Sequence, residues 1–112
     1  MRSVNKYRNK RTEVDGIKFQ SAGEAKRWRE LKLLEENGKI KNLRRQVPFR
    51  WKVTYTVGEN KFEETQRYVA DFVYVERGQE VIEDFKGYRT IAYLKKKKLM
   101  KLLYGIEIRE TK

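Results

Sequence analysis

The chain has 112 residues and carries 28 Lys and Arg against 16 Asp and Glu, so its formal net charge is +12. It contains no Cys and no His, which excludes disulfides, thiol nucleophiles, histidine metal sites and histidine general bases. Any chemistry therefore has to come from carboxylates, Lys, Tyr and the backbone, on a chain whose charge favours a polyanionic partner.

The first residues form a polar, cationic segment with few aliphatic side chains. We expect a flexible basic arm at residues 1–12, followed by one domain at residues 13–112, because a chain of this length builds a single core. Arg8, Lys10 and Arg11 in the arm are candidates for contacts with nucleic-acid phosphates. The alternative is an ordinary disordered terminus.

Two local signals follow the arm. Asp15-Gly16 is flanked by β-branched and aromatic residues, which predicts a β-hairpin over residues 12–19. Ser21 and Glu24 then have the spacing of a capping box, in which Ser caps the helix and Glu follows three positions later. This spacing predicts a helix that begins after Ser21 and ends at Asn37-Gly38.

Glu24 has an unusual place on this predicted helix. At 100° per residue it falls close to Trp28 and Leu31, near the middle of the apolar stripe. Its carboxylate is therefore either a cap that turns back to the amide of Ser21 or a group directed inward at a metal site. We expect Trp28 and Trp51 to lie in the core or at an interface rather than to be platforms for stacking bases.

The pattern changes to strict alternation from Val47 to Tyr55, which predicts a half-buried strand. Gly58-Glu59-Asn60 predicts a turn, and residues 61–75 read as the returning strand. A second turn at Arg77-Gly78-Gln79 leads into a strand at residues 80–86. Strands joined by such short turns form an antiparallel meander.

Thr90 caps a second predicted helix that runs to Tyr104 and ends at Gly105, and residues 106–109 alternate as a last short strand. The apolar positions of this helix are Ile91, Leu94, Leu99, Leu102 and Leu103. Its lysines, taken as candidate phosphate contacts, are Lys95, Lys96, Lys97, Lys98 and Lys101. Four lysines in a row wrap around a helix, so a charged solvent face is the alternative. The order of elements predicts an α/β fold, with a mixed sheet whose antiparallel meander is flanked by two helices.

Two acids and a lysine lie on neighbouring predicted strands. Because side chains alternate across a strand, Asp84 and Lys86 project from one face and Glu83 from the other. Asp71 shares its face with two valines, where a carboxylate is costly to bury unless it is paired or bound to a metal. We expect the meander to place Asp71 beside Asp84. The alternatives are a surface salt bridge at Asp71 and an exposed Asp84–Lys86 ion pair.

The residues that form the candidate site are, in chain order, Glu24, Asp71, Asp84 and Lys86. Their order resembles the core pattern of the PD-(D/E)XK nuclease superfamily, which has the restriction-endonuclease-like fold. Residues 14–25, 68–72 and 84–87 look like a family of short phage-encoded proteins of unassigned function. The last segment is also similar to that of phage-type endonuclease I, which resolves branched DNA. The chain departs from the pattern at Ala70, where a Pro is frequent, and in having Asp rather than the commoner Glu before x-Lys.

The resemblance implies a metal-dependent nuclease domain. Asp71 and Asp84, with the backbone carbonyl of Phe85, would hold Mg²⁺ or Mn²⁺. Glu24 would complete a second metal site or bind a metal-bound water. Lys86 would orient the attacking water and stabilise charge on the phosphorane. The implied function is a structure-directed DNA endonuclease, similar to a Holliday junction resolvase, in phage recombination or replication.

We expect branched or double-stranded DNA as the partner, and a homodimer, since two symmetric incisions in a four-way junction need two sites. The main alternative is a nucleic-acid-binding phage accessory protein without catalysis. No apolar run approaches the roughly 18–20 residues that span a bilayer, and no hydrophobic segment follows the basic N-terminus. We therefore expect no membrane association and a cytoplasmic location, in the bacterial host if a phage encodes the protein.

Overall fold

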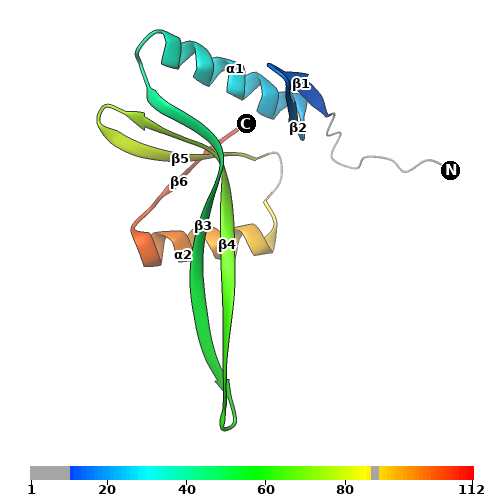
Figure 1. Ribbon diagram of the computed structural model, residues 1–112, viewed down its shortest axis with the longest axis vertical. Helices are drawn as coiled ribbons and strands as arrows, with labels where there is room; N and C mark the ends of the chain where they lie inside the picture. The colour runs from blue at the N-terminus through cyan, green and yellow to red at the C-terminus, as the bar shows by residue number, and fades with distance from the viewer. Residues whose placement is uncertain (1–10, 87–88) are drawn as a thin grey trace, which may run out of the picture.

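The computed structural model describes residues 11–86 and 89–112. The elements in chain order are β1 (Thr12–Val14), β2 (Ile17–Phe19), α1 (Ala22–Glu36), β3 (Lys41–Val57), β4 (Asn60–Glu76), β5 (Gln79–Phe85), α2 (Ile91–Tyr104) and β6 (Ile108–Thr111). The last four strands form one sheet in the order β3-β4-β5-β6, in which only the β5–β6 pair is parallel (Figure 1). The predicted α/β fold, with an antiparallel meander and two flanking helices, is confirmed.

The hairpin β1–β2 forms as its turn chemistry predicts. Asp15 and Gly16 both have positive φ, at 55° and 77°, which suits the tight two-residue turn of a hairpin. Thr12 already pairs with Phe19, so the strand begins one residue inside the expected arm. Residues 1–10 lie outside the described part of the chain, and with them the candidate phosphate contacts Arg8 and Lys10.

The helix α1 begins with the expected cap, since the Oγ of Ser21 accepts a hydrogen bond from the backbone N–H of Glu24 at 3.1 Å. It ends at Asn37, whose N–H donates to the carbonyl of Leu33 at 3.1 Å, and Gly38 follows with φ of 71°. Its buried residues are Glu24, Ala25, Trp28 and Leu31. The stripe predicted from the helical wheel is therefore the stripe that packs inward.

The two helices cover two separate apolar clusters. Trp28 of α1 packs between Phe19 and Phe72, with ring centroids 6.1 and 6.2 Å away. α2 packs on a second cluster, which includes Tyr68, Val73 and Ile82, and buries Tyr93 and Met100 against it. Trp51 belongs to the same cluster, so both tryptophans are core residues, as predicted.

Most of the apolar positions of α2 do not face the core. Only Leu99 of the five apolar positions packs against the cluster, whereas Ile91, Leu94, Leu102 and Leu103 are exposed. The helix lies across the β3–β4 ribbon (Figure 1), and its buried residues form a narrow strip on one side. Residues seven apart, Tyr93 and Met100, fill that strip, so the leucines on the other sides remain in solvent.

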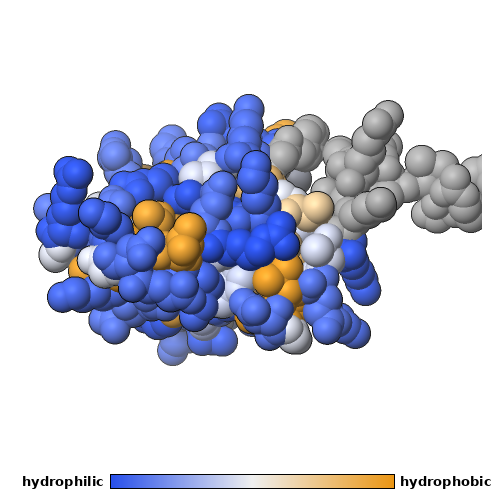
Figure 2. All heavy atoms as spheres, turned by 90° about the horizontal axis from the view of Figure 1, so that it is seen from above, coloured by the Kyte–Doolittle hydropathy of each residue, from blue (hydrophilic) through white to orange (hydrophobic). Residues whose placement is uncertain are grey.

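The strands β3 and β4 form a long ribbon that extends past α2, away from α1 (Figure 1). β5 pairs with β4 only between Phe72 and Glu76, which leaves the rest of β4 with a free edge on that side. β3 begins at Lys41, six residues before the predicted start, and β6 is shifted two residues toward the C-terminus. Seen from the α1 end, the surface is mostly hydrophilic with small apolar groups (Figure 2).

A local irregularity in β3 faces the candidate site. Gln46 has a positive φ of 53°, in the left-handed region that strand residues avoid. The pairs on either side, Arg45–Phe72 and Val47–Ala70, place Gln46 level with Asp71. At this point the buried side of β4 changes, because Ala70 packs in the cluster under α2 whereas Phe72 packs in the cluster under α1.

Candidate functional site

The centre of the site lies where β4 and β5 separate. Their last paired residues are Phe72 and Glu83. One step beyond, the N–H of Asp71 donates to Oδ1 of Asp84 at 2.9 Å, and the N–H of Phe85 donates to Oδ2 of Asp71 at 3.0 Å. Each carboxylate therefore takes the place of a strand carbonyl and is held by the backbone of the opposite strand. The predicted neighbourhood of the two acids is present.

Asp84 is nearly inaccessible, with 1% of its surface exposed. Its second oxygen, Oδ2, accepts a hydrogen bond from the hydroxyl of Tyr68 and lies 3.4 Å from the Nζ of Lys86. Burial, together with the charge of Asp84, raises the pKa of Tyr68 far above its usual range, so this hydroxyl remains a donor. The alternative of an ion pair on an exposed edge does not hold, because Asp84 is buried.

Lys86 is positioned by contacts on both its backbone and its side chain. Its N–H donates to the carbonyl of Thr111 at 2.8 Å, and its Nζ lies 4.0 Å from the centroid of the Tyr93 ring. The face of an aromatic ring stabilises an ammonium ion, more strongly where water is excluded. Tyr93 is held in turn, since its hydroxyl donates to Oε2 of Glu110 at 2.8 Å. The ammonium is thus placed between a carboxylate and an aromatic face.

Glu24 reaches the site from the first turn of α1 and is 7% exposed. Burial raises the pKa of this carboxyl; the charge of Arg45 opposes the shift, that of Asp84 adds to it and that of Lys86 opposes it. The Glu24 side chain is therefore close enough to Asp84 and Lys86 for their charges to affect its pKa. The cap at Ser21 is made by its hydroxyl with the Glu24 amide, while the Glu24 carboxylate lies on the buried side.

The negative charge of the carboxylates at the site is only partly compensated by the positive charge near them. The pKa of Asp71 is raised to about 7, first by burial and then by the charges of Asp84 and Glu24, while the hydrogen bond from the Phe85 amide and the charge of Lys86 lower it. The side-chain amide of Gln46 also donates to Oδ1 of Asp71, at 3.3 Å. A carboxyl that is half protonated near neutral pH marks a place where a cation would be favourable.

The donor set is suited to a hard divalent ion, because it consists of carboxylate oxygens alone. Within the described residues, however, no three acidic side chains are gathered closely enough to hold a metal ion. Mg²⁺ is commonly bound through one or two carboxylates, with water and substrate phosphate as the other ligands. Asp71 and Asp84 match this requirement for one or two carboxylates, and Glu24 lies beside them.

Glu83 lies on the opposite face from Asp84, as the pleat predicts, and has a different environment. It is fully buried and accepts two hydrogen bonds from the guanidinium of Arg27, at 2.7 and 2.9 Å. The hydroxyls of Tyr74 and Thr111 donate to it as well, at 2.5 and 3.2 Å. These contacts tie α1 to the sheet, so Glu83 belongs to the fold and not to the site.

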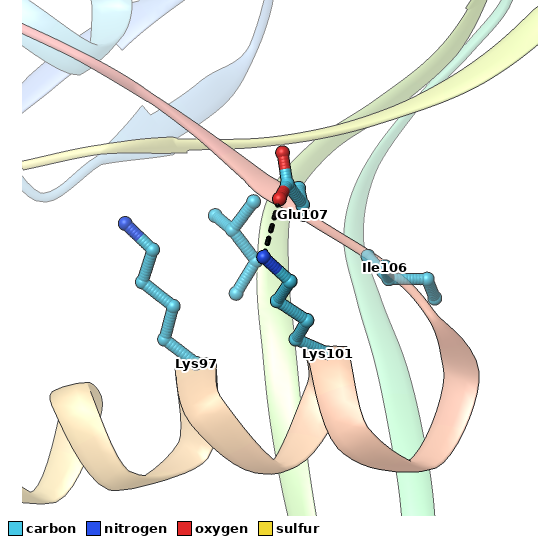
Figure 3. A pocket seen from close by; sticks show the side chains of 5 residues that line it. Lys97, Lys101, Ile106 and Glu107 are labelled. Atoms are coloured by element: carbon cyan, nitrogen blue, oxygen red, sulfur yellow. Dashed lines mark hydrogen bonds and ion pairs between the residues drawn. The ribbon is translucent and has the colours of Figure 1, made fainter.

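The basic residues of α2 separate into two groups. Lys97 is 2.8 Å from Glu110 and Lys101 is 2.7 Å from Glu107, and both lysines line one pocket at the end of the helix (Figure 3). Lys95 and Lys98 are exposed, as is Arg11 near the start of the described chain, whereas Lys96 is half-buried. Two of the five candidate lysines therefore already form ion pairs with acids of the same chain.

The residues that sequence reasoning missed are the partners of the acids. Tyr68 and Gln46 hydrogen-bond to Asp84 and Asp71, and Tyr93 supports Lys86. Tyr68 offered one signal, since it lies three positions before Asp71 on the same predicted strand. For Gln46 and Tyr93, which come from other elements, the sequence contains no such signal.

Neither described helix has the length and apolar character needed to cross a membrane. No curated protein and no solved structure matches the chain. One family does, over residues 4–111, a range that includes every described element and all four residues of the candidate site. The protein thus belongs to the family described as "Protein of unknown function (DUF1064)".

Proposed function

We propose that the protein is a divalent-metal-dependent endonuclease that hydrolyses phosphodiester bonds of DNA, with branched DNA such as a four-way junction as its substrate class. Membership of the PD-(D/E)XK superfamily is part of this proposal. The observation that supports it best is the mutual arrangement of Asp71 and Asp84, with the ammonium of Lys86 3.4 Å from Asp84. A chain with a net charge of +12 would attract the substrate.

Asp71 and Asp84 would hold Mg²⁺ or Mn²⁺, together with the carbonyl of Phe85, and Glu24 would contribute to a second position. A bound divalent ion supplies Lewis-acid chemistry, because it neutralises phosphate charge and lowers the pKa of water. The two aspartates need little rearrangement for this role, since backbone amides already orient them. Both oxygens of Asp71 and Oδ1 of Asp84 each accept one hydrogen bond and keep a second lone pair for an ion, whereas Oδ2 of Asp84 also lies 3.4 Å from the Nζ of Lys86.

The other groups act on the water and on the phosphate. In hydrolysis the water oxygen bonds to phosphorus as the water gives up a proton, one ester bond breaks, and the departing oxygen takes up a proton. Lys86 would orient the water and stabilise charge on the phosphate oxygens as it develops. Tyr93 and Asp84 hold this ammonium in place. Glu24, which is also buried, would hold a water by accepting a hydrogen bond from it.

The test is incubation of the protein with four-way junction, nicked and linear DNA in Mg²⁺ or Mn²⁺. We expect cleavage of the junction in preference to linear duplex, and loss of cleavage in Asp84→Asn. Calorimetric titration with Mn²⁺ should show binding that Asp71→Asn and Asp84→Asn both lose. Absence of cleavage on every substrate, or undiminished cleavage by Asp84→Asn, would contradict the proposal.

A second candidate is a DNA-binding protein without catalysis. It is favoured by the fact that the oxygens of Asp71 and Asp84 already accept hydrogen bonds from the protein, and that no three described acids form a ready ion site. This candidate predicts salt-sensitive DNA binding in EDTA that Asp71→Asn leaves unchanged, and no heat of Mn²⁺ binding.

The expected homodimer remains part of the proposal for a four-way junction, because paired incisions require two sites related by symmetry. Sedimentation of the protein with and without junction DNA measures the stoichiometry. One chain per junction together with paired incisions would contradict the dimer without affecting the nuclease proposal.

A further inference from the structure

An open groove of about 360 Å³ lies beside the candidate site, between the free edge of β4 and the first turns of α2. Tyr68 and Tyr93 line it, and so does Lys86. Because Tyr68 also donates a hydrogen bond to Asp84, one side chain separates the groove from the buried acid. A ligand in the groove would therefore lie next to Asp84, which holds the metal ion in the proposed nuclease.

The charged side chains that line the groove are all basic. Arg67 of β4 and Lys96 of α2 line it together with Lys86, and none of the described residues that line it is acidic. Lys86 is paired with Asp84, but within the described part of the chain Arg67 and Lys96 have no acidic partner within salt-bridge distance. In the same helix Lys97 and Lys101 are paired, whereas Lys95 and Lys98 also lack a salt bridge among the described residues, so Lys96 is distinguished by its place in the groove.

The strand pairing adds a second, independent sign of an anionic ligand. Arg67 lies directly opposite Arg50 in the β3–β4 ladder. Like charges at directly opposed positions of an antiparallel pair are destabilising, and an anion beside one of them would relieve the repulsion. The ladder offers the opposite arrangement nearby, since Lys52 on β3 is 3.2 Å from Glu63 on β4.

We propose that this groove binds the phosphodiester backbone of a DNA strand next to the bond to be cut, with Arg67 and Lys96 each contacting a phosphate. The assignment rests on the proposed function for the position of the scissile bond. Arg67 can meet a phosphate with two parallel hydrogen bonds, and Lys96 with a point charge. The contacts carry no base specificity, as suits a substrate recognised by its shape. Only one lysine of the run in α2 lines the groove.

The matched variants are Arg67→Gln/Lys96→Gln, which removes the two unpaired groove charges, and Arg29→Gln/Lys98→Gln, which removes two exposed charges that do not line the groove. Both double variants have the same net charge and keep all groups of the candidate site. Fluorescence anisotropy with a labelled four-way junction and a labelled linear duplex, in EDTA over a range of salt concentrations, measures their affinities.

The groove variant should bind DNA about tenfold more weakly, and the slope of log K against log[salt] should become shallower by about 1.4–1.8, because two phosphate contacts are lost. The control variant should keep a slope close to that of the wild type. Equal losses in both variants, or no DNA binding by the wild type, would overturn the assignment. So would an equal loss of binding to polyglutamate, which would show a site for acidic chains in general.

Cleavage assays on the same proteins separate this inference from the proposed function. Loss of DNA affinity that is specific to the groove variant, in a protein that cuts no substrate, supports the groove and overturns the nuclease proposal. Normal affinity and cleavage in the groove variant, with loss of cleavage in Asp84→Asn, supports the nuclease and overturns the groove.

Discussion

Asp71 and Asp84 each accept a hydrogen bond from the backbone of the strand on which the other acid lies, 2.9 and 3.0 Å long. The two carboxylates are thus part of the junction between β4 and β5 and are oriented before any ligand binds. Orientation in advance lowers the reorganisation that a catalytic group has to undergo. It also means that changes at these positions affect stability and chemistry together, which the following variants separate.

Glu83→Gln and Asp84→Asn form a matched pair, since each removes the charge of a buried acid at adjacent positions of β5. Glu83→Gln should lower the free energy of unfolding by about 3 kcal/mol, because Arg27 loses its buried counter-charge. The folded fraction should keep its specific activity. Asp84→Asn should lower cleavage by a factor of about 100 or more with a smaller loss of stability. Urea unfolding and cleavage rates measure both, and the reverse pattern would contradict the assignment of the two acids.

Tyr68→Phe removes one hydroxyl and leaves Asp84 with one donor fewer. Because Asp84 is buried, the free energy of unfolding should fall by about 1–2 kcal/mol. Tyr55→Phe is the control, since Tyr55 is 44% exposed and stacks on Phe62 with ring centroids 5.5 Å apart. The free energy of unfolding of this control variant should stay within about 0.5 kcal/mol of the wild-type value. Urea denaturation of both variants checks the difference, and equally small effects would show that the hydroxyl contributes nothing to the junction.

Stability should fall as the pH rises from about 4 to about 7. The pKa of Asp71 is about 7 in the folded protein and about 3.8 in an unfolded chain, so between these values the folded state binds the extra proton. Across this range the free energy of unfolding falls by up to about 4 kcal/mol, and above pH 7 this group contributes no further change. Glu24, whose pKa is also raised, adds to the effect with the same sign. Thermal unfolding in EDTA from pH 5 to 8 should show the decline, and Asp71→Asn should weaken it.

Mn²⁺ should reduce the same decline, because an ion bound at Asp71 stabilises the deprotonated carboxylate. The unfolding temperature at pH 8 should therefore rise with Mn²⁺ more than at pH 5, and Asp71→Asn should abolish the difference. An equal rise at both pH values would indicate that the ion binds elsewhere.

Gly23→Ala should destabilise the protein although alanine favours helices. A Cβ at this position would lie 2.3 Å from the Cζ of Phe85, so either the ring or the first turn of α1 has to move. Overpacking of this kind costs about 1–3 kcal/mol. The same substitution in a Phe85→Ala background should be neutral or stabilising, because the ring is gone. A double-mutant cycle by chemical denaturation measures the coupling, and a coupling of zero would contradict the close approach.

The elements that the sequence predicted well have local causes. Asp15-Gly16 specifies a tight turn, Ser21 caps α1, and the alternation of β5 assigns Asp84 and Glu83 to opposite faces. The place of Glu24 on the buried stripe follows from helical geometry in the same way. In each case the information lies within a few residues of the feature.

The features that were missed depend on contacts between elements. The ring beneath Lys86 comes from α2, and the amide beside Asp71 comes from an irregular residue of β3, Gln46. The leucines of α2 did not indicate its buried side, because hydrophobicity alone does not reveal which side of a helix meets the sheet. Leu102 is 71% exposed, whereas Met100 is fully buried.

The junction between β4 and β5 has a consequence for relatives of this protein. Since Asp71 and Asp84 accept backbone hydrogen bonds, selection for a folded sheet alone would retain both acids in a chain that had lost its chemistry. A pair of aspartates is therefore an ambiguous marker of activity within the family. Lys86 and Glu24 are better markers, because the hydrogen bonds that close the junction do not require their side chains.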